Sequence, residues 1–309
     1  MLFCLSFIFF FIVIIFTYRA IKMTSDEQAF TQEDYVPVTA GLKEMGKLPD
    51  AFNRPFDHTE VVQHRIDLDF DDQAFYLDNI MSEDECKAVI AFGEAIGYGP
   101  VETDCKKECT ARKVMATSEP FTKVLFERLR LFLKDIDISS EYSIHKLHLE
   151  GNSFAMQGQW KPEKLDTVFR LSRYTEGGHF KPHFDGFYAD PGNPTMCRTM
   201  KSLVFYLNSP ADGCGGNTNF LDENVKQTDG SPAILQSVQP KPGRVLVFNH
   251  RSLHESVPTD NSVKYIIRSD VMYKRHSFGG LSENDLQAID FLNRAEQFEV
   301  CLHPEYFIE

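Results

Sequence analysis

Two histidines and one aspartate in the second half of the chain have the residue types and spacing of a metal site. His183 and Asp185 are two residues apart, so on a β-strand both side chains point to the same face. His254 follows 71 residues later. Two imidazoles and one carboxylate on one side of a metal leave adjacent positions open, as in non-haem Fe(II) sites. A His-x-Asp pair alone is more often a hydrogen-bonded surface pair, so this interpretation depends on what surrounds it.

Two cationic residues follow the second histidine at a spacing that suggests binding of an anion. Lys264 lies ten residues after His254, at the start of an apolar strand, where a cation removed from water needs an anionic partner. The distal carboxylate of 2-oxoglutarate would be such a partner. Arg268 shares the strand face of Lys264, so it is the alternative anchor or a second contact; otherwise it forms a structural ion pair with Asp270 or a neighbour. The spacing favours Lys264.

Two further histidines repeat the spacing of a helical zinc pair, His179 four residues before His183 and His250 four residues before His254. The nearby Gly177, Gly178 and Pro182 argue against a helix. On a strand, residues four apart lie roughly 13 Å from each other, too far to share a metal. We therefore expect His179 and His250 to be polar residues near the mouth of the site, or exposed.

The elements that must position these residues are mostly short strands. β-branched and aromatic residues dominate five segments that are separated by turns rich in glycine and proline: 168–174, 201–208, 217–221, 244–249 and 263–273. Many short strands at this spacing are typical of a sandwich or barrel rather than of a parallel α/β sheet.

Helices are predicted before the strands and after them. Ser82 and Glu85 form a capping box that opens a helix after the strand-like segment FYLDNI, and a second amphipathic helix is predicted over 121–134. A final helix is expected to begin at Ser282 and to run to about Phe298. The predicted fold class is α+β, with helices that support a β-barrel.

In the segment from about Phe75 to Tyr273, the ordered motifs resemble the prolyl 4-hydroxylase-like family of Fe(II)/2-oxoglutarate dioxygenases. The resemblance rests on FYLDNIMSEDEC, RLSRYTEGGHFKPHFDG, LVFYLN followed by GGNTNF, PKPGRVLVFNHRSLHESVP, and KYIIRSDVMY. It implies a double-stranded β-helix, that is, a jelly-roll or cupin-like barrel. It also implies that His183, Asp185 and His254 bind the iron and that Lys264 anchors 2-oxoglutarate. Tyr174 and Tyr206 would line the 2-oxoglutarate pocket, unless they only fill the barrel core.

The resemblance implies hydroxylation of a prolyl residue in a protein or peptide. Fe(II), 2-oxoglutarate and O2 would be required, succinate and CO2 would be released, and L-ascorbate would keep the iron reduced. The segment 187–198 is expected to form a loop over the site. The alternatives are a small-molecule hydroxylase of the same chemistry, a cupin-like metal hydrolase, and an inactive binding module.

The N-terminus differs in composition from the rest of the chain. Residues 2–18 are almost wholly apolar, and Arg19 and Lys22 follow. We therefore predict a single-pass membrane anchor over 1–22, with the catalytic domain in the cytoplasm or the ER lumen, unless Met23 is the true start. The remaining divisions are a linker or arm over 23–71, a catalytic domain over 72–276 with its metal-binding core at 168–275, and a helical tail over 277–309.

The charge and the cysteine content exclude other classes of protein. The formal net charge is -13, and the acidic residues are spread along the chain, which argues against a surface for nucleic acid. Seven cysteines are too few for a disulfide scaffold in a chain of 309 residues. Cys105 and Cys109 could form a local disulfide or half of a zinc site, but two plain thiols are favoured.

Overall fold

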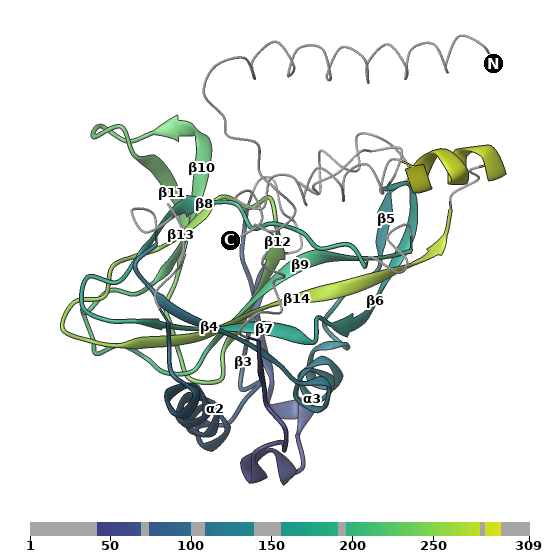
Figure 1. Ribbon diagram of the computed structural model, residues 1–309. Coiled ribbons are helices and arrows are strands. Elements are labelled where there is room, and N and C mark those ends of the chain that lie inside the picture. The colour runs from purple at the N-terminus through teal and green to yellow at the C-terminus, as the bar shows by residue number, and fades with distance from the viewer. Residues whose placement is uncertain are drawn as a thin grey trace, which may run out of the picture. The chain divides into compact units, whose positions relative to one another are not determined.

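The computed structural model describes residues 42–68, 74–99, 109–138, 156–190, 196–278 and 282–291 (Figure 1). The chain divides into two compact units, 1–41 and 42–309, and all described residues belong to the second. Its strands are β1 (Lys43–Glu44), β2 (Val62–Arg65), β3 (Phe75–Asp78), β4 (Arg112–Thr117), β5 (Ile136–Ile138), β6 (Gly158–Leu165), β7 (Val168–Tyr174), β8 (Phe180–His183), β9 (Cys197–Tyr206), β10 (Thr218–Lys226), β11 (Pro232–Val238), β12 (Val245–Asn249), β13 (His254–Ser256) and β14 (Lys264–Ser277). Its helices are α2 (Glu83–Ile96), α3 (Glu119–Leu129) and the short 3-10 turns η2 (Asp50–Asn53) and η3 (His58–Glu60).

The strands form two sheets. The larger sheet has the order β1-β4-β7-β14-β9-β12-β3-β2, with β6 beside β14 and β5 beside β6. The smaller sheet has the order β11-β10-β13-β8. All neighbouring strands are antiparallel except β1 and β4. Two antiparallel sheets whose neighbouring strands are far apart in sequence make the double-stranded β-helix that the resemblance implies.

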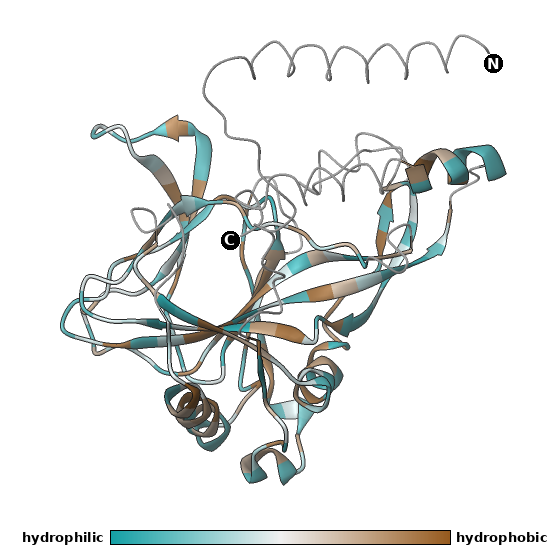
Figure 2. Ribbon diagram, viewed as in Figure 1, coloured by the Kyte–Doolittle hydropathy of each residue, from teal (hydrophilic) through white to brown (hydrophobic). Residues whose placement is uncertain are grey.

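The alternation of side chains along the central strands separates two cores. On β9 and β12, Leu203, Phe205, Val245 and Val247 belong to a core that includes residues of both helices. The residues that alternate with them along the strands, such as Tyr206, point the other way and pack with Phe220 and Val238 of the small sheet. Figure 2 shows hydrophobic stretches along the central strands, interrupted by hydrophilic ones. Both faces of the large sheet are therefore buried, one under helices and one inside the barrel.

The helices α2 and α3 pack on the outer face of the large sheet (Figure 1). The predicted capping box is confirmed: the Ser82 hydroxyl accepts from the Glu85 amide, and the Glu85 carboxylate accepts from the Ser82 amide. Glu85 also forms a buried bidentate ion pair with Arg128 of α3, with Nη2–Oε1 at 2.7 Å and Nη1–Oε2 at 2.9 Å. One carboxylate thus fixes the start of α2 and joins the two helices.

The second helix differs from the predicted range of 121–134. It begins earlier, because Ser118 caps it by accepting from the Phe121 amide and Pro120 occupies its first turn. It ends at Leu129. The last predicted helix is also present at its start, where the Ser282 hydroxyl accepts from the Asp285 amide and residues 283–291 are helical. Its predicted continuation to Phe298 lies outside the described residues.

Part of the predicted linker or arm is built into the sheet. Within 42–68, β2 pairs with β3 and β1 pairs with β4, while Met45 and Phe52 are buried in the helix-side core. Little in the sequence indicates this, because both strands are short and β2 is a mostly polar and exposed edge strand, with Val62 as its one apolar residue.

The structure corrects the prediction of a single-pass membrane protein with a transmembrane helix. No helix in the part of the chain that the structure describes is both long and apolar enough to cross a membrane. The longer of the two α-helices named above, α2, has 14 residues, whereas a bilayer requires about 20. The segment to which the anchor was assigned, 1–22, lies outside the described residues, as does residue 23.

Breaking the ion pair between the helices should destabilise the fold. We expect Glu85→Ala to lower the free energy of unfolding by about 3–5 kcal/mol, because it leaves the Arg128 guanidinium buried without its carboxylate. Denaturant unfolding of the full chain measures this change. The control is Glu83→Ala, which removes an exposed carboxylate from the same turn and should cost less than about 1 kcal/mol. Equal losses in both variants would contradict a special role for the buried pair.

Candidate metal centre

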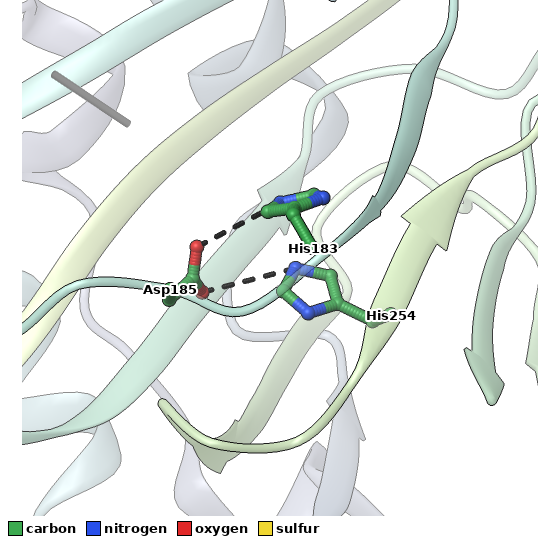
Figure 3. A group of neighbouring side chains, drawn as sticks. All are labelled: His183, Asp185 and His254. Carbon is green, nitrogen blue, oxygen red and sulfur yellow. Dashed lines mark ion pairs between the residues drawn. The ribbon is translucent and has the colours of Figure 1, made fainter. Parts of the chain in front are cut away.

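The small sheet and the turn after β8 bring His183, Asp185 and His254 together (Figure 3). His183 ends β8, His254 begins β13, and the two residues are register partners in adjacent antiparallel strands. The Asp185 Oδ1 atom lies 3.9 Å from His183 Nε2, and Oδ2 lies 3.8 Å from His254 Nε2. One candidate ligand atom from each residue lies within 4.8 Å of the others. The three side chains predicted from sequence spacing therefore converge on one point.

Each imidazole is held by a backbone carbonyl two residues earlier. His183 Nδ1 lies 2.7 Å from the Lys181 carbonyl oxygen, and His254 Nδ1 lies 2.9 Å from that of Ser252. A carbonyl only accepts hydrogen bonds, so each Nδ1 carries the proton and each Nε2 keeps its lone pair. Burial lowers the pKa of His183 to about 3 and also lowers that of His254. Both rings are therefore neutral near pH 7, the form that binds a metal.

The Asp185 carboxylate is buried and ionised. Burial opposes its charge, but Arg268 and the two histidines hold its pKa well below the usual range. Arg268 approaches Oδ2 with Nη2 at 3.0 Å and Nε at 3.1 Å, and the Ser202 hydroxyl donates to the same oxygen at 2.6 Å. These bonds orient the carboxylate toward the two imidazoles, as supporting residues commonly do at metal sites.

The expectation that His250 lies near the mouth of the site or is exposed is wrong, because only 2% of its surface is accessible. Its Nδ1 lies 2.8 Å from the Ser202 oxygen, and its Nε2 lies 3.1 Å from the Thr199 hydroxyl. The single hydroxyl proton of Ser202 goes to Asp185, so His250 Nδ1 donates to Ser202. Burial lowers the pKa of His250 to about 3, which keeps it neutral. It supports the carboxylate through Ser202, beyond the cluster of candidate ligands.

Lys264 lines the same cavity as the candidate ligands, as do Tyr174 and Tyr206. Its side chain is 1% exposed. The ammonium donates to the Gly216 carbonyl at 2.9 Å and to the Ser256 hydroxyl, and it lies 4.4 Å from the centre of the Tyr174 ring. Among the described residues, no carboxylate forms an ion pair with it. Burial therefore lowers the pKa of Lys264 to about 7.

Arg268 differs from Lys264 in that carboxylates already surround it. Besides Asp185, it binds Asp270 Oδ1 through Nη1 at 2.7 Å. Burial alone would lower the pKa of Arg268, but the two carboxylate charges outweigh burial and raise it. The ion pair with Asp270 that the sequence left open is therefore present. Arg268 positions the candidate metal ligand Asp185, whereas Lys264 keeps its charge available.

Both candidate pocket tyrosines are buried in the barrel core and line the cavity. The Tyr206 hydroxyl donates to Thr218 at 2.8 Å. Burial raises the pKa of both phenols, so they stay protonated and can donate hydrogen bonds. The two interpretations made from sequence, core residue and pocket wall, are compatible at these positions.

Several residues of the site could not be singled out from sequence. Ser202, Thr218 and Arg170 reach the site because they alternate with apolar residues on strands of the barrel. The available signal in the sequence was that these residues alternate with apolar residues along their strands. This alternation does not show which side of a strand faces the barrel interior and which side faces the helices. His179 is half-buried, and its Nδ1 lies 3.0 Å from the Gly177 carbonyl oxygen, outside the cluster of candidate ligands.

The described residues cover only part of the predicted thiol pair and of the predicted loop. Cys109 is a buried free thiol, while Cys105 lies outside the described residues. The ends of the predicted loop 187–198 pair with each other, since Ala189 and Arg198 form an antiparallel bridge. Its tip, 191–195, lies outside the described residues, so its position over the site stays a prediction.

The donor set fits a divalent iron. Two neutral imidazoles and one carboxylate are the usual ligands of non-haem Fe(II), and three ligands leave positions for a co-substrate and O2. The cavity that these three residues line is also lined by the buried ammonium of Lys264. This arrangement suits a ligand that chelates a metal at one end and carries a carboxylate at the other.

Comparisons with known proteins agree with this chemistry. Residues 169–269 match the model of the 2OG-Fe(II) oxygenase superfamily. The matched segment contains all three candidate ligands and Lys264. Prolyl 4-hydroxylase 13 of Arabidopsis thaliana is 21% identical over 212 residues, which cover 64% of this chain and 70% of that protein.

Solved structures of prolyl hydroxylases are also similar. A Pseudomonas putida prolyl-4-hydroxylase is 16% identical, with 75% of this chain and all of that chain covered and a TM-score of 0.40. The viral collagen prolyl hydroxylase of Paramecium Bursaria Chlorella virus-1, solved with 2OG, is 17% identical, with 64% and 94% covered and a TM-score of 0.39. A Trichoplax adhaerens prolyl hydroxylase, solved with a hypoxia inducible factor peptide fragment, is 15% identical, with 67% and 86% covered and a TM-score of 0.41. Similarities of this size do not transfer a binding mode.

The support of Asp185 by Ser202 can be tested through metal affinity. We expect Ser202→Ala to weaken Mn(II) binding roughly 10–100-fold, because the carboxylate loses its shortest hydrogen bond and its orientation. Calorimetric titration of the full chain with Mn(II) measures the change. Ser209→Ala removes a hydroxyl that bonds the Pro240 carbonyl instead, and it should leave the affinity unchanged. An unchanged affinity in Ser202→Ala would mean that Arg268 alone orients the ligand.

Proposed function

We propose, from the premise that residues 169–269 belong to the 2OG-Fe(II) oxygenase superfamily, that this protein hydroxylates a prolyl residue of a protein or peptide. The enzyme is a 2-oxoglutarate-dependent dioxygenase, with Fe(II), 2-oxoglutarate and O2 as its cofactor and co-substrates. His183, Asp185 and His254 would hold the iron, and Lys264 would bind the distal carboxylate of 2-oxoglutarate.

The observation that carries this assignment is the environment of Lys264. A buried ammonium without a carboxylate partner among the described residues is unfavourable, and an anion entering the cavity would remove that cost. The candidate ligands lie in the wall of the same cavity. A metal hydrolase would have no use for a buried cation placed there. An intact ligand cluster likewise gives no support to an inactive binding module.

The residues divide the work between binding and orientation. Lys264 neutralises the far carboxylate, while Tyr174 covers the ammonium and helps to exclude water. Arg268 and Ser202 fix Asp185, and the two backbone carbonyls fix the imidazoles, so the ligands need no rearrangement when a metal arrives. When bound, the iron supplies the oxidation that couples decarboxylation of 2-oxoglutarate to hydroxylation of the substrate. The protein supplies the placement of the reactants.

The prolyl substrate is supported by the relative from Arabidopsis thaliana, which is 21% identical over 212 residues and is described as a prolyl 4-hydroxylase. L-Ascorbate would serve to keep the iron reduced, as the resemblance implies. A small molecule that contains a proline ring would use the same chemistry and is the alternative substrate.

Anaerobic spectroscopy tests the cofactor assignment directly. Addition of Fe(II) and then 2-oxoglutarate to the full chain should produce the visible charge-transfer band of the chelate. Asp185→Ala should abolish the band because the iron site is lost. Lys264→Ala should shift its 2-oxoglutarate dependence at least tenfold higher, because a charge-assisted bond to the carboxylate is lost. The outcome that would sink the 2-oxoglutarate assignment is a wild-type protein that binds Fe(II) but shows no band.

The affinity for 2-oxoglutarate should depend on pH. In the free protein, Lys264 loses its proton around pH 7, so at higher pH the neutral amine must take up a proton before it can hold the carboxylate. The dissociation constant should therefore rise as pH increases above about 7, by up to about tenfold per unit. Tyr174 and Cys109 are the titratable groups that face this ammonium.

Calorimetry in buffers of different ionisation enthalpy should detect uptake of up to one proton at pH 8. Lys264→Arg should bind 2-oxoglutarate without this uptake, because a guanidinium stays protonated. Proton uptake that persists in Lys264→Arg would assign the titration to another group.

A further inference from the structure

A second cation in the wall of the cavity has no partner of opposite charge. Arg170 of β7 lines the same cavity as the candidate ligands. Among the described residues, its guanidinium makes no ion pair and no hydrogen bond. The charges of Asp270, Asp185 and Asp166 act on it without direct contact. A guanidinium has five donors, so such an arginine is available for a ligand.

The strand register makes the position of Arg170 costly without a ligand. Arg170 is the register partner of Arg268 on β14. The two strands β7 and β14 lie side by side (Figure 1). Like charges directly opposite each other destabilise a sheet. Arg268 is already paired with Asp185 and Asp270, whereas Arg170 forms no ion pair with the carboxylates around it. Burial and the charge of Arg268 accordingly lower the pKa of Arg170.

Lys113 adds a third available cation at the edge of the site. It lies on β4, next to β7, and lines the cavity. Its ammonium lies 4.8 Å from the centre of the Phe180 ring, and that ring stacks on His183 at a centroid distance of 3.6 Å. Within the described ranges, no carboxylate pairs with it. Lys113 is therefore held beside a candidate metal ligand by an aromatic ring alone.

The charges around the cavity balance in number, but not every cation is paired. The two charges of Fe(II) and the two of 2-oxoglutarate cancel. The cations Lys113, Arg170, Lys264 and Arg268 are set against the carboxylates Asp185, Glu255, Asp270 and Asp166. Among the described residues, Arg170 and Lys113 form no ion pair with any of these carboxylates. Their donors therefore remain available to a further anion.

That anion is distinct from 2-oxoglutarate. Lys264 is the register partner of Tyr174, whereas Arg268 is the partner of Arg170, four residues farther along both strands. Four residues of a strand span roughly 13 Å. The distal carboxylate of 2-oxoglutarate is assigned to Lys264, and Arg170 lies four residues along the strands from that anchor. Arg170 therefore faces the part of the cavity left for the other substrate.

We propose that Arg170, with Lys113 at the edge, binds a carboxylate of the hydroxylated substrate. The inference rests on the proposed function and narrows its substrate class. The carboxylate could come from the free carboxyl group of a prolyl small molecule or from an acidic residue beside the target proline of a peptide. Both sources offer the planar, two-oxygen acceptor that a guanidinium binds through two parallel hydrogen bonds.

Matched pairs of probes test the proposal. Calorimetry on the full chain, loaded with Mn(II) and 2-oxoglutarate to prevent turnover, compares acetate with acetamide and L-proline with prolinamide. It also compares a short peptide in which glutamate precedes proline with the same peptide carrying glutamine. At least one carboxylate should bind about tenfold more tightly than its amide. The pair that shows the preference identifies the source, with acetate reporting the bare site.

The variant Arg170→Gln should remove this preference and leave the dissociation constant of 2-oxoglutarate unchanged. The matched control is Arg173→Gln on the same strand, because Arg173 faces outward and pairs with Glu94 at 3.1 Å. That control should keep the preference. Equal binding of carboxylate and amide in all three wild-type pairs would overturn the proposal, as would a loss of 2-oxoglutarate affinity in Arg170→Gln. A wild-type protein that does not bind 2-oxoglutarate would instead overturn the proposed function.

Discussion

The site depends on a single buried carboxylate, that of Asp185, and on the positive charge of Arg268 that keeps it ionised. Without this guanidinium, burial would favour the protonated acid, which is a poor metal ligand. Arg268 also holds Asp270, so one side chain compensates two carboxylates inside the barrel. Ser202 and His250 extend the same hydrogen-bond network outward. The loop after β8 and strands β9 and β14 are thus tied together through polar contacts in an otherwise apolar interior.

The two sheets have separate tasks. The histidines come from the small sheet, on adjacent strands that place them side by side. The cations come from the large sheet, where Lys264, Arg268 and Arg170 occupy the barrel face of β14 and β7. The helices bury the opposite face of that sheet, so its strands cannot rotate to bring these cations to solvent. The positions of the reactants therefore follow from the register in which the strands pair.

Sequence spacing could predict the ligands because the chemistry leaves a local trace: a histidine and an aspartate two residues apart, then a histidine and a lysine at fixed intervals. The expectation that His183 and Asp185 share a strand face is wrong, because β8 ends at His183 and Asp185 lies in the loop that follows. The capping box of α2 was predictable for the same reason, since Ser82 and Glu85 act within one helical turn. His250 was misjudged because its role arises from contacts with Thr199 and Ser202 of another strand. The strands within 42–68 were missed because their partners, not their own residues, define them.

Both candidate ligand imidazoles take their orientation from backbone carbonyls two residues earlier in the chain, and the carboxylate takes its orientation from neighbouring side chains. A site assembled in this way exists before any ion arrives. Such a rigid set of two nitrogens and one oxygen binds cobalt, nickel or zinc at least as tightly as iron, following the general order of divalent metal affinities. The choice of iron must then be made outside the polypeptide, by which metal the cell supplies while the chain folds.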